Sequence, residues 1–265
     1  MNAVAHKQKG GFTLEELLIV VAVVGILVAL VVTFLQNNRD PHGIRINCMN
    51  KQKQIGTAFR VFAADNDDRY PLQARNNLYI VPGSPSGDQV DAASAAAWQV
   101  AQAMWNELQN PKILLCWSDR ERLSFQTVSD FNGLAGNSNV ITTTSFSHPI
   151  NRNSALSFAF GVAADESRPQ GVLVIDRNVN NVGVAGASVM SNVALTNTRA
   201  VMNGTRGPTQ AVSVRGTPMH GLEGNLAFAD GSVQRATAEV LQQAFENAAK
   251  AYGTTITNQN EMLFP

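Results

Sequence analysis

A histidine and two carboxylates near the C-terminal end are the residues whose types and spacing could do chemistry. His220 stands ten positions before Asp230-Gly231, and Glu223 lies between them. An imidazole beside a carboxylate could form an acid–base pair or part of a metal site. A catalytic metal normally needs about three protein ligands, and no second histidine lies near His220 in the sequence. We therefore expect no metal and interpret His220 as a structural residue that hydrogen-bonds into the segment around Asp230.

The segment that must position these groups has the pattern of a β-hairpin. Leu226 and Phe228 alternate with small or polar residues, and Val233 resumes the alternation. Between them, Asp230-Gly231 is a typical two-residue hairpin turn with positive φ. The sequence therefore predicts a hairpin over residues 225–235.

The composition of the chain excludes several functional classes. Of its 265 residues 45% are hydrophobic, which is enough for a folded core, and 20 basic residues balance 20 acidic ones. No net basic field exists to hold nucleic acid. Two cysteines exclude a disulfide scaffold and a Cys-rich metal site. Because no nucleophile elbow, P-loop, Rossmann glycine pattern or zinc motif occurs, we expect no enzyme, no cofactor and no nucleic-acid partner.

A long apolar run lies close to the N-terminus. Residues 17–35 carry no charge over 19 positions. At about 1.5 Å per residue they span roughly 28 Å as a helix, close to the ~30 Å hydrocarbon core of a bilayer. Lys7 and Lys9 precede the run, but no small-residue cleavage site follows it, which disfavours a secretory signal peptide. The run predicts a transmembrane helix.

The residues around the start of this run resemble the type IV prepilin and pseudopilin signature. Residues 10–20 read GGFTLEELLIV. The resemblance implies that a prepilin peptidase cuts after Gly11, on the cytoplasmic side, and methylates the new N-terminal residue, Phe12. It also implies that Glu16, four residues beyond Phe12, takes part in assembly with other pilin or pseudopilin subunits. Glu15 departs from the signature, which usually has an apolar residue there.

The two glutamates at the start of the apolar run can be interpreted in two ways. A carboxylate at the start of an apolar helix is costly in lipid unless it is paired. A freshly cut α-amino group could pair with Glu16, and the helix macrodipole also favours a carboxylate near the N-terminus. The alternative is that Glu15 and Glu16 lie solvated among the lipid headgroups. The residues alone leave both possibilities open.

The C-terminal motif resembles a second pattern of the same kind of protein. Together with the prepilin start, His220-x9-Asp230-Gly231 resembles a subgroup of bacterial pilin-like proteins named for an H-x9-DG motif, as do residues 48–56 and 111–116. The resemblance implies an α+β, pilin-like fold, in which a long N-terminal helix packs on a small antiparallel sheet with additional helices. We expect a cleaved leader (1–11), a transmembrane helix (12–39) and a periplasmic globular domain (40–265).

Several elements of the globular part can be predicted from periodicity. An apolar stripe with a period of 3.6 residues predicts a helix that continues, after an interruption at Pro41 and Gly43, to about residue 65. The stripe consists of Ile44, Cys48, Ile55, Phe59 and Phe62. The other predicted elements are a helix over 92–108 with Trp98 and Trp105 facing inward, strands over 113–116, 156–162 (half-buried) and 171–176, and a helix over 237–252 capped by Thr237.

The two cysteines, Cys48 and Cys116, also allow two interpretations. On the prepilin interpretation both lie outside the cytoplasm, where disulfides persist. A bridge closing a loop of about 70 residues adds roughly 4 kcal/mol and would join the helix to the head. Because Cys48 lies on the buried stripe, two reduced core thiols are the alternative.

These observations lead to two expectations about function. The first is a structural subunit, anchored in inner-membrane lipid by one span, that is processed and N-methylated. It would assemble into a type II secretion pseudopilus or a type IV pilus-like filament with its C-terminal domain periplasmic or extracellular. The second is a membrane-anchored periplasmic binding module whose loops 123–153 and 177–217 hold a glycan or peptide.

Overall fold

The computed structural model of the chain describes residues 13–36, 41–74, 95–131, 141–179, 198–201, 219–220, 223–252 and 261–265. By its internal contacts the chain forms two units, Met1–Gly43 and Ile44–Pro265. Each is described by itself. The expected leader, residues 1–11, lies outside the described residues.

The first unit contains one long helix, α1 (Leu14–Gln36). It agrees with the predicted transmembrane segment, and its part from Leu14 to Val31 is long and apolar enough to cross a bilayer. From Leu14 to Val31 its large apolar side chains are exposed on all sides, from 49% for Val20 to 77% for Leu14. A helix that is apolar all round has no polar face to turn toward water, so its natural surroundings are lipid or other helices.

The second helix, α2 (Pro41–Ala64), carries the predicted apolar stripe. Pro41 stands in its first turn, where a proline is tolerated because its missing N–H would be unpaired anyway, and Gly43 lies inside the helix. The expected interruption at these two residues is therefore wrong for Gly43, and Pro41 marks a helix start. The buried stripe is confirmed: Cys48, Ile55, Phe59 and Phe62 are at most 2% exposed, and Ile44 is half-buried.

The second unit is built on a six-stranded sheet with the order β3-β6-β1-β2-β4-β5, in which every pairing is antiparallel. The fold is thus α+β and pilin-like, as expected. The sequence did not predict β3 and β6, which pair with each other at one end of the sheet. The strands are β1 (Phe158–Gly161), β2 (Val172–Asp176), β3 (Thr198–Val201), β4 (Gly224–Phe228), β5 (Val233–Ala236) and β6 (Glu261–Phe264).

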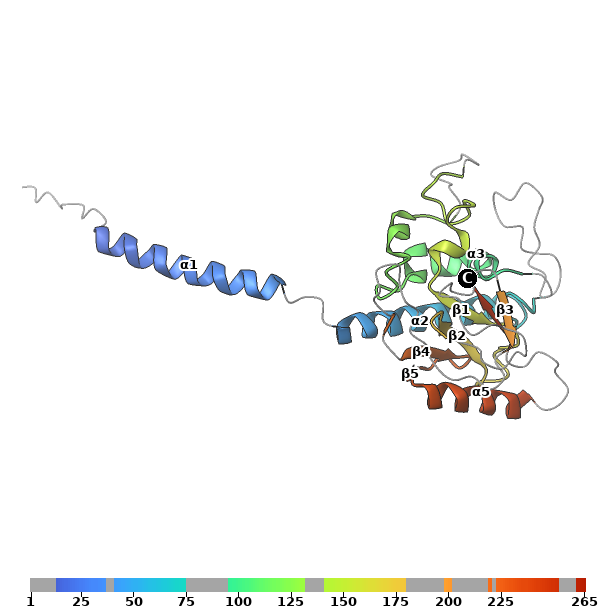
Figure 1. The fold of residues 1–265 in the computed structure, drawn as a ribbon. Coiled ribbons are helices and arrows are strands. Elements are labelled where there is room, and N and C mark those ends of the chain that lie inside the picture. The colour runs from blue at the N-terminus through green and yellow to red at the C-terminus, as the bar shows by residue number, and fades with distance from the viewer. Residues whose placement is uncertain are drawn as a thin grey trace, which may run out of the picture. The chain divides into compact units, whose positions relative to one another are not determined.

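Both faces of this sheet are covered, because α2 packs on one face and α5 (Ala238–Tyr252) on the other (Figure 1). Phe158 and Phe160 of β1 face the α2 side, where the ring of Phe160 lies 5.7 Å from that of Phe59. Ala159 belongs to the core on the α5 side. All four residues of β1 are consequently buried, and the prediction of a half-buried strand there is wrong.

Two predictions for residues 92–116 need correction. The predicted helix over 92–108 consists of α3 (Ala97–Ala103) and α4 (Trp105–Leu108), broken at Met104, so that Trp98 is buried but Trp105 is 41% exposed. The predicted strand over 113–116 begins instead as a 3-10 helix, η1 (Pro111–Leu114), because Pro111 favours a helical start and the Asn110 side chain accepts the Lys112 N–H. Two further 3-10 helices are η2 (Leu123–Thr127) and η3 (Arg152–Ala155).

The C-terminal hairpin and helix agree with the sequence pattern. β4 and β5 pair as expected, but only Gly231 takes positive φ (81°), whereas the two-residue turn predicted it for Asp230 as well. The Phe228 N–H donates to the Ser232 carbonyl, so these two residues continue the strand register and the turn between them, Ala229–Gly231, is one residue longer than predicted. At the start of α5 the Val240 N–H donates to Thr237 Oγ1 at 3.4 Å, which agrees with Thr237 as the cap.

Candidate functional site

The N-terminal end of α1 is closed by a reciprocal pair of hydrogen bonds. The Thr13 N–H donates to Glu16 Oε2 at 2.9 Å, and the Glu16 N–H donates to Thr13 Oγ1 at 3.3 Å. This arrangement is a capping box, which satisfies two backbone donors that have no partner inside the helix. Glu16 therefore caps the N-terminal end of α1 and also places a carboxylate there. Thr13 was not among the expected site residues, although the Thr13-x-x-Glu16 spacing is a sequence signal for such a cap.

The remaining residues of the expected processing site cannot be placed. Gly11 and Phe12 both lie outside the described residues. Farther along α1, a Cβ added at Gly25 would meet nothing within 4 Å. This stretch of the helix therefore has room for the close approach of another helix.

The second unit brings His220 and both cysteines together. Cys48 of α2 and Cys116, which follows η1, form a disulfide with an S–S distance of 2.20 Å. His220 Nε2 lies 3.1 Å from Cys116 Sγ, and His220 Nδ1 lies 3.1 Å from Ser118 Oγ. The structure thus has the bridged form of the two alternatives for the cysteines. The bridge joins α2 to the segment of Cys116 and Ser118, which the His220 ring contacts.

The His220 ring is closed off from solvent and held neutral. Its side chain is only 1% exposed, and burial lowers its pKa from 6.5 to about 4. A disulfide sulfur carries no hydrogen, so the neutral tautomer that fits has its proton on Nε2, while Nδ1 accepts from the Ser118 hydroxyl. The backbone at His220 takes a φ of 51°, which is rare for a residue with a side chain.

A buried carboxyl group, Asp176 at the end of β2, lies next to this ring. Its Oδ2 is 3.7 Å from His220 Nε2. Asp176 accepts hydrogen bonds from the Gln52 side chain and from both the backbone and side chain of Asn225. Burial raises its pKa from 3.8 to about 7, against the effect of these hydrogen bonds. The group therefore links α2, β2 and β4 at one buried point.

The segment of His220 is also tied to the start of α2. Arg45 Nη2 donates to the His220 carbonyl at 2.8 Å, and Arg45 also pairs with Glu223. Glu223 in turn binds Arg235 of β5. His220 and Glu223, at the start of the C-terminal motif, are therefore both held against α2 by Arg45.

The other end of the motif also contacts α2. A Cβ added at Gly56 would lie 3.8 Å from the Gly231 Cα, and the nearest atoms to one added at Gly231 belong to Arg60. Asp230 is exposed, and its Oδ1 accepts the Ser232 N–H at 2.8 Å. The described contacts of Asp230 and of His220 are thus separate, and the ring bonds to Cys116 and Ser118 instead of into the hairpin, which corrects the expected partner.

The chemistry of this cluster is limited by its disulfide. The ligand atoms of Cys48, Cys116 and His220 all lie within 4.8 Å of one another, as a metal site requires. While the two sulfurs are bonded to each other, neither can act as a thiolate ligand or nucleophile. The arrangement therefore supports a structural role, in which His220 and Asp176 fill a buried polar site behind the disulfide.

An exposed apolar helix near the N-terminus with a capped start, together with an α+β head, is the arrangement of a pilin-like, membrane-anchored protein. A model of the prokaryotic N-terminal methylation motif matches residues 6–32. This match supports a type IV pilin-like precursor, and it implies processing by a prepilin peptidase and assembly with other pilins. No curated protein and no solved structure matches the chain.

Proposed function

We propose that the chain is a prepilin-like structural subunit that a prepilin peptidase cuts after Gly11 and N-methylates at Phe12. The observation that carries the proposal is the position of the methylation motif, residues 6–32, over the start of the exposed apolar helix α1. Cleavage there removes the leader and leaves α1 as a single-pass inner-membrane anchor. The second unit is then the periplasmic domain.

The mature subunit packs helix to helix into a type II secretion pseudopilus or a type IV pilus-like filament. Two features of α1 support this proposal: its apolar side chains are exposed on all sides, and Gly25 has open space beside it. In the filament the Glu16 carboxylate pairs with the α-amino group of Phe12, on the same or a neighbouring chain. The resemblance to the H-x9-DG subgroup supports the same kind of filament assembly. Both ring nitrogens of His220 already have partners, Cys116 and Ser118, which supports a structural role without catalysis.

The proposal is tested by separating the charge of Glu16 from its cap. Glu16→Gln keeps an oxygen that can accept the Thr13 N–H but removes the charge, whereas Glu16→Ala removes both. We expect both variants to insert and to be processed, and both to be absent from sheared filaments. Thr13→Ala, which removes the hydroxyl partner and keeps the charge, is the matched control and should still assemble. Normal filaments from Glu16→Gln would overturn the role of this charge.

A further inference from the structure

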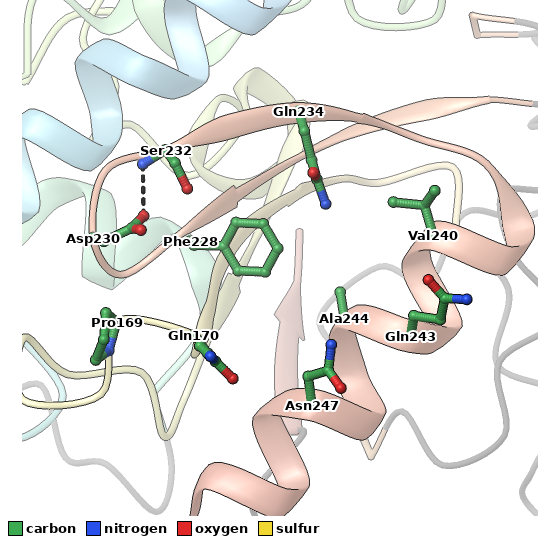
Figure 2. Close-up of a pocket in the computed structure, with 10 residues that line it drawn as sticks. All are labelled: Pro169, Gln170, Phe228, Asp230, Ser232, Gln234, Val240, Gln243, Ala244 and Asn247. Atoms are coloured by element: carbon green, nitrogen blue, oxygen red, sulfur yellow. Dashed lines mark hydrogen bonds between the residues drawn. The ribbon is translucent and has the colours of Figure 1, made fainter.

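A pocket of about 350 Å³ lies between α5 and the β4–β5 hairpin (Figure 2). Its volume is near the lower end of the roughly 300–1,000 Å³ range of small-molecule sites. The pocket is separate from the His220 cluster, and neither the processing motif nor helix α1 contributes a residue to it. Its lining comes from the turn before β2, from the hairpin and from α5.

An aromatic ring forms part of the apolar surface of this pocket, beside Pro169, Val240 and Ala244. Phe228, the last residue of β4, stands near the centre of the view in Figure 2 and is only half-buried. Because side chains alternate along a strand, it shares the α5 face of the sheet with Leu226, two residues earlier, which is fully buried. One part of the Phe228 side chain therefore packs on the core beneath α5, and the rest lines the pocket.

Four primary amides surround the ring, and they come from different elements. Gln170 precedes β2, Gln234 lies on β5 directly opposite Leu226, and Gln243 and Asn247 lie one turn apart on α5. All four residues are exposed, and within the described part of the chain none of their amides has a hydrogen-bond partner in the protein. Each offers two N–H donors and one acceptor oxygen. The pocket therefore presents an unused set of both donors and acceptors.

The charge of the pocket narrows the class of ligand. Asp230 is the one charged residue among those that line it, and its Oδ1 already accepts the Ser232 N–H. Without a basic side chain, the lining is not suited to a phosphate or another strong anion. A saccharide fits this chemistry, since its hydroxyls both donate and accept hydrogen bonds and its C–H face can lie against the electron-rich face of an aromatic ring.

We propose that this pocket binds a neutral saccharide of one or two rings. Phe228 is the surface on which a sugar ring rests, and Gln234, Gln243 and Asn247 bind its hydroxyls. The site differs from the loops 123–153 and 177–217, which the second expectation from the sequence assigned to a glycan or peptide. It also goes beyond assembly, because it would give a filament subunit an affinity for a surface or secreted glycan.

The test uses the full-length chain in lipid nanodiscs and three probes: N,N′-diacetylchitobiose, cellobiose and maltose. Binding is followed by saturation-transfer NMR of the sugar protons and quantified by titration. We expect at least one probe to bind, with the double variant Gln243→Ala/Asn247→Ala weakening it about tenfold or more. Gln242→Ala is the matched control, because this amide lies on the same helix, bonds to Glu246 and does not line the pocket. It should leave the affinity unchanged.

A second variant tests the aromatic surface without emptying the core. Phe228→Leu keeps most of the side-chain volume and removes the π face, so the melting temperature should change little while saccharide affinity falls at least severalfold. The proposal is overturned if none of the three sugars binds or if the double amide variant binds as well as wild type. It is also overturned if a short peptide such as tri-asparagine, and no sugar, occupies the pocket. None of these outcomes depends on cleavage after Gly11.

Discussion

The His220 side chain shows how a titratable group can serve structure by staying uncharged. Its ring lies between the Cys116 sulfur, the Ser118 hydroxyl and the Asp176 carboxyl, and its main-chain carbonyl accepts from Arg45. A proton added to this ring would bring a second positive charge close to Arg45 in a site closed to water. The neutral form is therefore the one that the fold requires.

This requirement predicts a dependence of stability on pH. The pKa of His220 is about 4 in the folded protein and 6.5 ordinarily, so the unfolded chain takes up a proton first as the pH falls. The stability due to the neutral ring is fully present above pH 6.5 and is lost as the pH falls toward 4, by about 3 kcal/mol. His220→Gln cannot titrate, so wild type should lose more stability than this variant over that interval in urea unfolding.

Asp176 changes the stability with pH in the opposite direction to His220. The comparison of wild type with His220→Gln allows for this effect. Its raised pKa means that its protonated form contributes stability below about pH 4, which is lost as the pH rises through 7. Because Asp176 is present in both proteins, most of its own contribution cancels in the difference between wild type and His220→Gln. Parallel stability curves between pH 6.5 and 4 would contradict the buried neutral ring.

The partners of His220 could not be predicted from the sequence, although His220 itself could be singled out. Cys116 and His220 are separated by more than a hundred positions, and Asp176 stands in an ordinary strand with no motif around it. Gln52 points into the same cluster from the buried side of α2, where a polar residue has no periodic signal. Such contacts depend on how the layers pack, which local patterns do not record.

Among the elements, those with a strong local signal were predicted and those that depend on distant pairing were not. The stripe of α2, the face of α5 and the alternation of the β4–β5 hairpin each repeat within one segment. By contrast β3 and β6 have four residues each and exist through pairing with each other and, for β6, with β1. Neither segment alternates apolar and polar residues, since β3 reads TRAV and β6 reads EMLF, so no strand period marks them in the sequence.

One glycine decides how closely two of these strands approach. A Cβ added at Gly161, the last residue of β1, would lie 2.0 Å from the Val172 carbonyl oxygen at the start of β2. Because the obstacle is backbone, Gly161→Ala should force β1 and β2 apart and cost about 3 kcal/mol. The free energy of unfolding in urea measures this cost.

Gly56→Ala on α2 is the matched control for that substitution. Gly56 is also buried, but the nearest atom to an added Cβ is the Gly231 Cα at 3.8 Å, an ordinary contact. Alanine also favours the helical backbone by up to about 1 kcal/mol. Wild-type stability or better is therefore expected for Gly56→Ala. A Gly161→Ala protein as stable as wild type would show that the strands are not held this closely.

The disulfide adds to the stability that the two cores give the globular unit. Cys48 and Cys116 are 68 positions apart, so their bridge removes many conformations from the unfolded chain. Full reduction should lower the stability of wild type by about 4 kcal/mol, measured by urea unfolding with and without reductant. Cys48→Ala/Cys116→Ala should be as weak as reduced wild type and insensitive to reductant. Two free thiols in the untreated protein would favour the reduced alternative.

The proposed function requires that α1 remain in the membrane after the chain before Phe12 has been removed. The apolar surface of this helix is exposed, and the methylation motif covers its start. The most direct test is the intact mass of the protein from cells that contain or lack prepilin peptidase. With the peptidase, the account predicts a membrane-bound chain that begins at Phe12 and carries one added methyl group; without it, the chain keeps residues 1–11. A mature protein that retains the leader in the presence of the peptidase, or one released by a cut beyond α1, would contradict the account.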